Sequence, residues 1–268
     1  MMDQVIDMYR SLLDENKGEQ EYQAFLEENT SFIPRHFVQN HGIHFDLVLR
    51  KLRISSDMIT DFVFLSKSSI SWNYVMIEIE KPSSKFFKDG ALSLHNDFRS
   101  GIDQIKTWQA WFSNPNNKVH FEEQLSFLKK PVRDAPVEIK YVLVTGRRSE
   151  YEGRREKIDL IKSYESPDFK IMSFDSLCEN YENNNELYLG IRRNKSVDIV
   201  TEKIISTNFL DWCDESDFTL SGPLKSSLID LLSQEIQKAR SGSKISQIWA
   251  DRREETFRKL ERMQAKNA

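Results

Sequence analysis

The chain has 268 residues, a formal net charge of -4 and 39% hydrophobic residues. This composition is typical of a soluble globular protein with a sizeable core, and it excludes collagen-like, disulfide-scaffolded and wholly disordered chains. Because the overall charge is negative, binding of a nucleic acid would require a local basic surface.

Cysteine usage and hydropathy bear on the compartment of the protein. Cys178 and Cys213 are the two cysteines, and neither lies in a CxxC or Cys/His cluster, which argues against a zinc site or a disulfide. No segment approaches the roughly 20 apolar residues that span a bilayer, and the N-terminus lacks the apolar region of a signal peptide. We therefore expect a cytoplasmic protein with reduced thiols and no membrane association.

Apolar residues recur at helical spacing in the first 33 residues and predict two short helices separated near Gly18. From Gly42 the pattern changes to runs rich in β-branched and aromatic residues, in HFDLVLRKLRI, MITDFVFL and YVMIEIEK. These runs predict three sequential strands in an antiparallel meander. Helical spacing returns from Asn96 to Phe112, with Ser93 or Asn96 as the expected cap.

A polar segment, SNPNNKVHFEEQLSFLKKPVRDAP, separates this helix from the next apolar run. The run from Val137 to Thr145 is compact and predicts a strand that is buried on both faces. Residues 152–164 predict a charged helix, Lys170 to Phe174 a further strand, and Asp175 to Tyr181 a short helix.

The order of these elements predicts an α/β core with a mixed sheet flanked by helices, over residues 1–185. The remaining residues, 186–268, are poorly patterned at first and then contain two helical segments, Leu224 to Arg240 and Ile245 to Met263. We expect this part to form a mainly helical C-terminal extension, with a soft boundary near residue 185. No internal repeat is visible.

Three acidic residues fall on two neighbouring predicted strands. Because successive strand side chains alternate between faces, Glu78 and Glu80 share one face while Lys81 projects to the other. Burying unpaired like charges in an apolar strand costs on the order of several kcal/mol, so a divalent metal is the simplest compensation. Asp61 lies on the preceding strand and can reach the same cluster across a hairpin.

Three converging carboxylates are hard oxygen ligands that suit Mg²⁺ or Mn²⁺ and leave coordination positions for water and a phosphate. Such a metal lowers the pKa of its bound water, which makes phosphodiester hydrolysis the natural reaction. The simpler interpretation of Asp61 is a strand-edge aspartate paired with a lysine.

The order of an acid, a Glu-x-Lys strand and a following helix resembles the PD-(D/E)XK nuclease superfamily, with Asp61, Glu78 and Glu80 at the motif positions. This resemblance implies a restriction-endonuclease-like fold. It also implies a functional role for Gln104, which with Trp108 is similar to a Gln-xxx-Tyr helix element. Glu21 matches the glutamate of an N-terminal helix and would be a further metal ligand.

A closer resemblance is to the Shedu anti-phage defence proteins, over roughly residues 20–180. It is carried, in this order, by EYQAFLEENTSFI, TDFVFL, VMIEIEKP, GIDQIKTWQ and YVLVTGRR. The resemblance implies a nuclease domain that acts on DNA in defence against phage and forms homo-oligomers. We expect the DNA to be double-stranded.

The chain departs from the superfamily pattern at one position, because Glu80 stands where the motif lysine is expected and Lys81 is out of phase. A Glu-x-Glu variant occurs among active restriction endonucleases. Our hypothesis is therefore a Mg²⁺- or Mn²⁺-dependent DNA endonuclease, in which Asp61 and Glu78 bind metal and Glu80 is a ligand or general base. The alternatives are a nuclease-like scaffold that binds nucleic acid or protein without cutting, and a metal-dependent RNase.

Two groups of basic residues are candidates for binding the nucleic acid. Lys81 and Lys85 follow the acidic strand and could line a DNA groove, and Arg147 and Arg148 end a predicted central strand, where they could hold phosphates. The alternatives are a solvated loop for the lysines and a salt-bridge network for the arginines.

Overall fold

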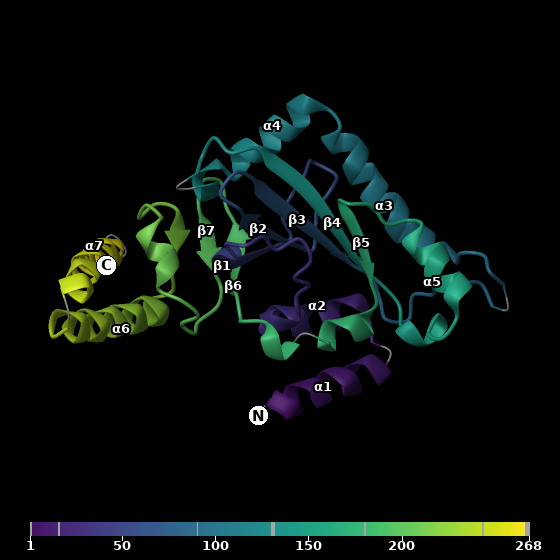
Figure 1. The fold of residues 1–268 in the computed structure, drawn as a ribbon, viewed down its shortest axis with the longest axis horizontal. Coiled ribbons are helices and arrows are strands. Elements are labelled where there is room, and N and C mark those ends of the chain that lie inside the picture. Colours follow the sequence, from purple (N-terminus) through teal and green to yellow (C-terminus); the bar gives the residue numbers. More distant parts are fainter. Residues whose placement is uncertain are drawn as a thin grey trace.

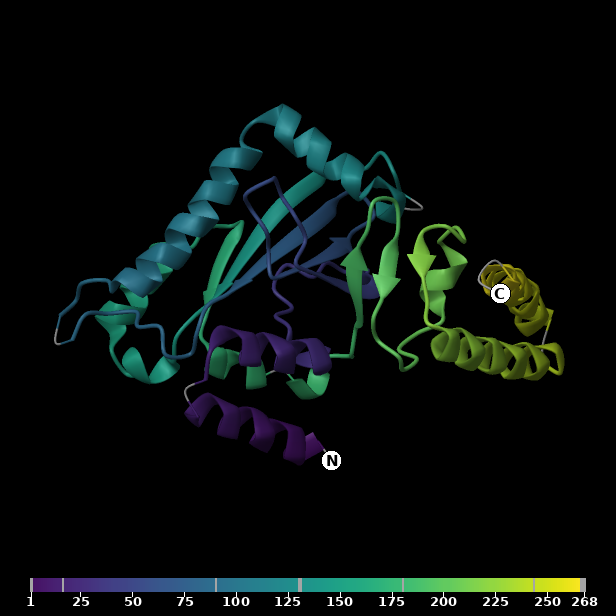
Figure 2. The same cartoon turned by 180° about the vertical axis from the view of Figure 1, so that it is seen from behind.

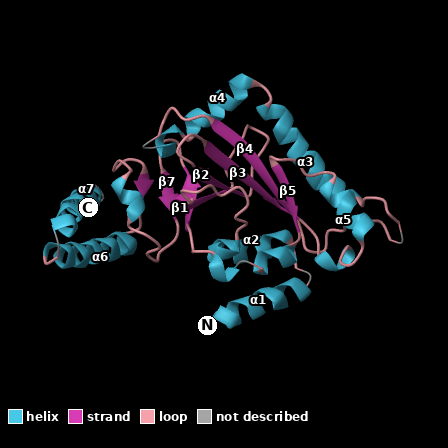
Figure 3. Ribbon diagram, viewed as in Figure 1, coloured by secondary structure: helices cyan, strands magenta, loops and turns pink. Residues whose placement is uncertain are grey.

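The structure is a computed structural model that describes residues 2–15, 17–89, 91–129, 132–179, 181–242 and 244–265. Within these residues, one mixed sheet of eight strands forms the centre of the molecule, and helices surround it (Figures 1 and 3). The strand order is β5-β4-β3-β2-β1-β6-β7-β8. The strands are β1 (Ile43–Arg50), β2 (Phe62–Lys67), β3 (Trp72–Ile79), β4 (Val137–Val144), β5 (Phe169–Met172), β6 (Tyr188–Arg192), β7 (Val197–Ile199) and β8 (Phe218–Thr219).

The α-helices are α1 (Met2–Asp14), α2 (Glu19–Glu28), α3 (Asn96–Phe112), α4 (Pro115–Gln124), α5 (Arg155–Lys162), α6 (Gly222–Arg240) and α7 (Lys244–Ala265). Short 3-10 turns connect them: η1 (Thr30–Phe32), η2 (Ser126–Lys129), η3 (Arg148–Glu150), η4 (Phe174–Cys178), η5 (Tyr181–Asn183) and η6 (Asn208–Asp211). In the described part of the chain, no helix combines the length and the apolar character needed to cross a membrane.

The pairing of the first three strands confirms the predicted meander, because β1 with β2 and β2 with β3 are antiparallel. Strand β4 then pairs with β3 in parallel, and β5 with β4 in parallel, which makes the sheet mixed as expected. Helix α3 has the predicted bounds, but the expected caps, Ser93 and Asn96, are wrong. His95 is the cap residue, and its Nδ1 accepts a hydrogen bond from Asp97 N at 3.2 Å.

Helices cover both faces of the sheet (Figure 2). Tyr22 and Leu26 of α2 belong to the same buried cluster as Ile77 of β3, whereas Trp108 of α3 belongs to the cluster of Tyr74. This division follows from the alternation of strand side chains. Even-numbered residues of β3 therefore face α3, and this is the face on which Glu78 lies.

The sheet continues past the predicted boundary near residue 185. Strand β6 pairs in parallel with β1, with Leu49 opposite Gly190, and β7 and β8 extend the sheet further. A Cβ atom on Gly190 would lie 2.5 Å from Val197 Cγ1, so the close strand packing requires glycine there. The C-terminal part thus contributes strands to the core sheet before its two helices, α6 and α7, which lie beyond the β7 side (Figure 1).

Candidate functional site

The predicted acidic residues lie at one end of the central strands. Asp61 directly precedes β2, Glu78 lies in β3, and Glu80 directly follows β3. The antiparallel register pairs Phe62 with Ile77, which places Asp61 opposite Glu78 across the hairpin. The positions of these three residues on paired strands therefore bring them to the same end of the sheet.

Asp61 is 4% exposed, and both of its carboxylate oxygens have partners. Oδ2 accepts a hydrogen bond from the backbone N–H of Ile79 at 2.7 Å. Oδ1 forms an ion pair with Lys51 Nζ at 2.5 Å. Pairing with a lysine, the simpler interpretation of Asp61, is thus present together with the acidic cluster, and the two contacts fix the orientation of this carboxylate.

Glu78 is 9% exposed and has one satisfied and one unsatisfied oxygen. Its Oε1 accepts a hydrogen bond from Gln104 Nε2 of α3, so the predicted glutamine orients the predicted acid. Its Oε2 is buried with no hydrogen-bond partner among the described residues. Burial, followed by the charges of Asp61 and Glu80, raises the pKa of Glu78 from its usual 4.5 to about 9. Without a bound cation, the protonated form is therefore favoured at neutral pH.

Glu80 is half-buried and lies against α3. Burial, and then the carboxylates of Glu19, Asp61 and Asp97, raise its pKa above the usual value. A Cβ atom on Gly101 of α3 would lie 3.5 Å from Glu80 Oε1, so the helix backbone approaches this side chain closely. Glu80 is accordingly an acid that binds a proton more readily than a solvated glutamate, which suits a general base.

Lys51 is a site residue that the sequence pattern did not single out. It directly follows β1, opposite Asp61, and its backbone N–H donates to Asp61 O at 2.8 Å. Burial acts to lower the pKa of Lys51. The hydrogen bond to Asp61 and the charges of Asp61, Glu78 and Glu19 have a larger effect in the other direction, so the pKa lies above its usual value. The predicted antiparallel meander could have identified Lys51, because the end of one strand lies beside the start of the next, which places Lys51 next to Asp61.

Glu19 and the predicted Glu21, both in the first turn of helix α2, have different environments. Glu19, at the first position of α2, interacts electrostatically with the cluster, because burial and the charge of Asp61 raise its pKa while Lys51 and Lys81 lower it. In the described part of the chain, Glu21 forms no hydrogen bond or ion pair with the acids of the sheet. Its carboxylate lies instead near its own helix end, where a Cβ atom on Gly18 would be 2.9 Å from Glu21 Oε2.

The acidic cluster offers oxygen atoms that a divalent cation could bind. The described residues contain no group of three or more His, Cys, Asp or Glu side chains that could hold a metal ion as they are placed. The chemistry of the cluster nevertheless fits one, because Glu78 Oε2 is a buried oxygen without a partner. Carboxylate oxygens are the ligands that Mg²⁺ and Mn²⁺ prefer, and a cation would supply the missing partner.

The predicted basic residues have different environments. Arg147 donates to Asp175 Oδ1 at 3.0 Å and to the carbonyl of Leu13, and Arg148 forms an ion pair with Glu179. These arginines therefore join η3 and η4 to α1, as in the salt-bridge alternative. Lys85 pairs with Asp89 at 3.0 Å, and Lys81 is exposed. Both lysines lie in the loop that follows β3, and the charge of Lys81 acts to lower the pKa of Glu80.

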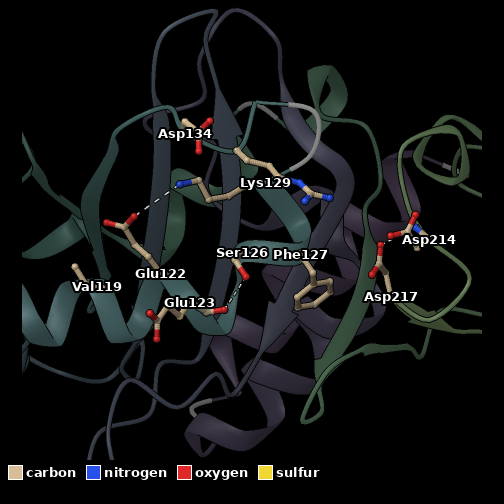
Figure 4. A pocket seen from close by; sticks show the side chains of 10 residues that line it. Val119, Glu122, Glu123, Ser126, Phe127, Lys129, Asp134, Asp214 and Asp217 are labelled. Carbon is tan, nitrogen blue, oxygen red and sulfur yellow. Dashed lines mark hydrogen bonds and ion pairs between the residues drawn. The ribbon is translucent and has the colours of Figure 1, made fainter.

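A cavity of about 540 Å³ lies elsewhere, between α4, η2 and the segment that precedes β8 (Figure 4). Acidic side chains, among them Glu122 and Asp217, line it together with Lys129, whose Nζ lies 3.7 Å from Glu122 Oε2. None of Asp61, Glu78, Glu80 or Gln104 lines this cavity. The acidic cluster at the end of β3 is thus a separate feature of the molecule.

Comparison with known proteins was made against family models and curated sequences. The family model described as "Shedu protein SduA, C-terminal" matches residues 16–178, which is more than half of the chain and includes Asp61, Glu78, Glu80 and Gln104. The search of curated proteins gave no match.

Proposed function

Because the chain belongs to the Shedu SduA C-terminal family, which indicates a role in anti-phage defence, we propose that it is a metal-dependent DNA endonuclease. In this proposal the fold is that of a PD-(D/E)XK nuclease, and Asp61, Glu78 and Glu80 bind Mg²⁺ or Mn²⁺. One observation supports it above the others: Glu78 is a buried acid with an unpartnered oxygen, next to two further acids.

The energetics of the cluster favour a cation as its ligand. Taking several carboxylates out of water is unfavourable unless an opposite charge is present. Burial, and then the charges of neighbouring acids, raise the pKa values of Glu19, Glu78 and Glu80. Lys51 forms an ion pair with Asp61 and so offsets one negative charge of the cluster. A bound divalent cation would offset the remaining charge and would polarise a phosphate and its attacking water.

The residues of the chain would divide the reaction between them. Gln104 holds Glu78 in one orientation through its side-chain amide. Asp61 is held by Ile79 N–H and Lys51, so it presents a fixed carboxylate. Glu80, with its raised pKa, takes the proton of the attacking water as the new P–O bond forms and the ester P–O bond breaks.

The nucleic acid would bind along the basic side of the cluster. Lys81 and Lys85 are the proposed phosphate contacts, since they lie in the loop that follows the strand that carries Glu78. For Arg147 and Arg148 to contact phosphates, the ion pairs with Asp175 and Glu179 would have to open. A homo-oligomer, as the family resemblance implies, stays a prediction that light scattering in solution can check.

The test is cleavage of a supercoiled plasmid with Mg²⁺ or Mn²⁺ by the wild type, Asp61→Asn and Glu78→Gln. We expect each substitution to lower the cleavage rate at least about 100-fold, the scale expected when a group that acts in the transition state is removed. Glu152→Gln is the matched control, because Glu152 is exposed on a turn, and it should cleave like the wild type.

Three other results would contradict the proposal in different ways. Equal cleavage by the wild type and both site variants would mean that another site or a contaminant cuts the plasmid. Cleavage of RNA but not of DNA in a parallel substrate panel would identify a metal-dependent RNase. Binding of DNA without any cleavage would identify the non-catalytic scaffold.

A further inference from the structure

The lysine that is missing at position 80 has a counterpart on the neighbouring strand. Lys51 Nζ lies 2.5 Å from Asp61 Oδ1, and its backbone N–H donates to Asp61 O at 2.8 Å. Lys81 is adjacent to the motif in sequence, but within the described residues it makes no ion pair or hydrogen bond with an acid of the cluster. Lys51 is therefore the lysine that directly contacts the acidic site.

The backbone of Lys51 is held in an unfavourable conformation. Its φ of +47° lies in the left-handed region, which glycine adopts readily and a residue with a Cβ atom does not. Glycine at this position would remove the strain. A residue whose side chain had no role here would therefore be expected to be glycine. Strained non-glycine residues are concentrated at functional sites, where the surrounding structure maintains them. The register of β1 and β2 brings Lys51 to Asp61, because Lys51 and Asp61 lie opposite each other, two residues beyond the pair of Leu49 and Val63.

We propose that Lys51 supplies the ammonium group of the active site in place of the absent motif lysine, and that it contacts a non-bridging oxygen of the scissile phosphate. This inference rests on the proposed nuclease function. The side chain of Lys51 is 48% exposed while that of Asp61 is 6% exposed, so the ammonium lies between the buried acid and the solvent from which a phosphate would arrive.

The chemistry leaves Lys51 unchanged. The water oxygen forms a bond to phosphorus, the ester P–O bond breaks, the proton of the water passes to Glu80, and the leaving oxygen takes a proton from solvent. Lys51 stays protonated throughout, and its charge offsets the negative charge that develops on the phosphate oxygens. The competing interpretation is that Lys51 only occupies the place of a cation, in which case its removal would speed the reaction.

The experiment compares Lys51→Ala, Lys51→Gly and the matched control Arg53→Ala, which removes an exposed positive charge two residues further along the chain. We expect both Lys51 variants to cleave plasmid at least about 100-fold more slowly in single turnover at saturating Mg²⁺. By calorimetry they should bind Mn²⁺ within about threefold of the wild type, and the control should match the wild type in both assays.

Two further readouts separate catalysis from folding. Lys51→Gly should unfold at a higher temperature than Lys51→Ala, because glycine relieves the left-handed strain, yet it should be equally slow. Lys51→Arg, which keeps a positive charge at this position, should cleave at least about tenfold faster than Lys51→Ala. Such recovery would not arise from a purely structural role of Lys51.

The outcomes distinguish this inference from the function on which it rests. A Lys51→Ala protein that cleaves at the wild-type rate or faster overturns the inference, as does a loss of rate that is matched by a loss of Mn²⁺ binding. A Lys51→Arg variant that is no faster than Lys51→Ala also contradicts it. In each case Asp61→Asn should still be inactive; a wild type that does not cleave at all would instead overturn the proposed function.

Discussion

At the scale of single residues, Glu78 links the proposed function to stability. Its pKa of about 9 in the folded protein exceeds the usual 4.5, so the folded state binds the proton more tightly than the unfolded state does. The free energy of unfolding contributed by this group is therefore present at low pH and falls as the pH rises from about 4.5 to about 9.

Replacing Glu78 with glutamine should therefore stabilise the metal-free protein at pH 9. Glutamine keeps an oxygen that can accept the hydrogen bond from Gln104 and cannot ionise. Chemical unfolding at pH 6 and pH 9 should show a larger gain for Glu78→Gln at pH 9, with Glu152→Gln parallel to the wild type. A variant that is less stable than the wild type at pH 9 would contradict the buried, unfavourable charge.

Glu19 and Glu21 offer a second comparison at this scale. Glu19→Gln removes a charge that acts on the cluster and should weaken Mn²⁺ binding about threefold or more, whereas Glu21→Gln should leave it unchanged. Isothermal titration calorimetry measures both affinities. The reverse order would favour Glu21, the residue that the family resemblance implies.

The residues of the site were only partly predictable. Glu78 and Glu80 followed from the two-residue period of a strand, and Asp61 from the expectation that successive strands pair in a hairpin. Lys51 did not follow, because the register that places it opposite Asp61 is not fixed by the period of either strand. The choice between two glutamates of α2 could not be made either, since residues two apart differ by about 200° around a helix and the orientation of α2 on the sheet was unknown.

At the scale of elements, Gly146 joins the loop after the acidic strand to the end of β4. Its φ is +60°, and its N–H donates to Lys81 O at 3.1 Å. A Cβ atom there would lie 2.6 Å from the backbone oxygen of Ser84 and 2.6 Å from Phe86 Cε2. The path of the chain that leaves the site thus depends on this glycine.

Gly146→Ala should lower the free energy of unfolding by more than about 2 kcal/mol, because left-handed strain adds to overpacking against backbone. Gly153→Ala is the matched control, since Gly153 has a φ of +71° and open space around it, and it should cost only about 1 kcal/mol. Guanidinium unfolding of both variants measures the difference. Equal costs would show that the loop yields to the added methyl group.

Elements with strong periodicity were predicted, and weakly patterned ones were missed. The meander and α3 carry long apolar patterns and appear where expected. Helix α4 lies in the segment that was interpreted as polar. It was missed because Phe121 is its one buried residue, so it has no apolar repeat at helical spacing. Strands β6, β7 and β8 are short, and their place is set by pairing with β1, which lies far away in the sequence.

At the scale of the whole molecule, the sheet does not end with the predicted core. Cutting the chain after residue 185 would remove β6 and expose the hydrogen-bonding edge of β1 together with the apolar side chains of Leu47 and Leu49. We expect the fragment 1–185 to aggregate where the full chain does not, because an unprotected edge strand pairs with other chains. Size-exclusion chromatography checks this, and a monodisperse fragment with the same near-ultraviolet spectrum would refute it.

The place of β1 between β2 and β6 also sets an order of events during synthesis. Strands β1, β2 and β3 follow one another closely and can pair as soon as they leave the ribosome, so the acids and Lys51 can assemble early. The other side of β1 waits for residues 188–192, and at typical elongation rates that wait lasts roughly 10 to 30 s. The nascent chain therefore carries an assembled site on an unfinished sheet, and its exposure to misfolding is greatest in that interval.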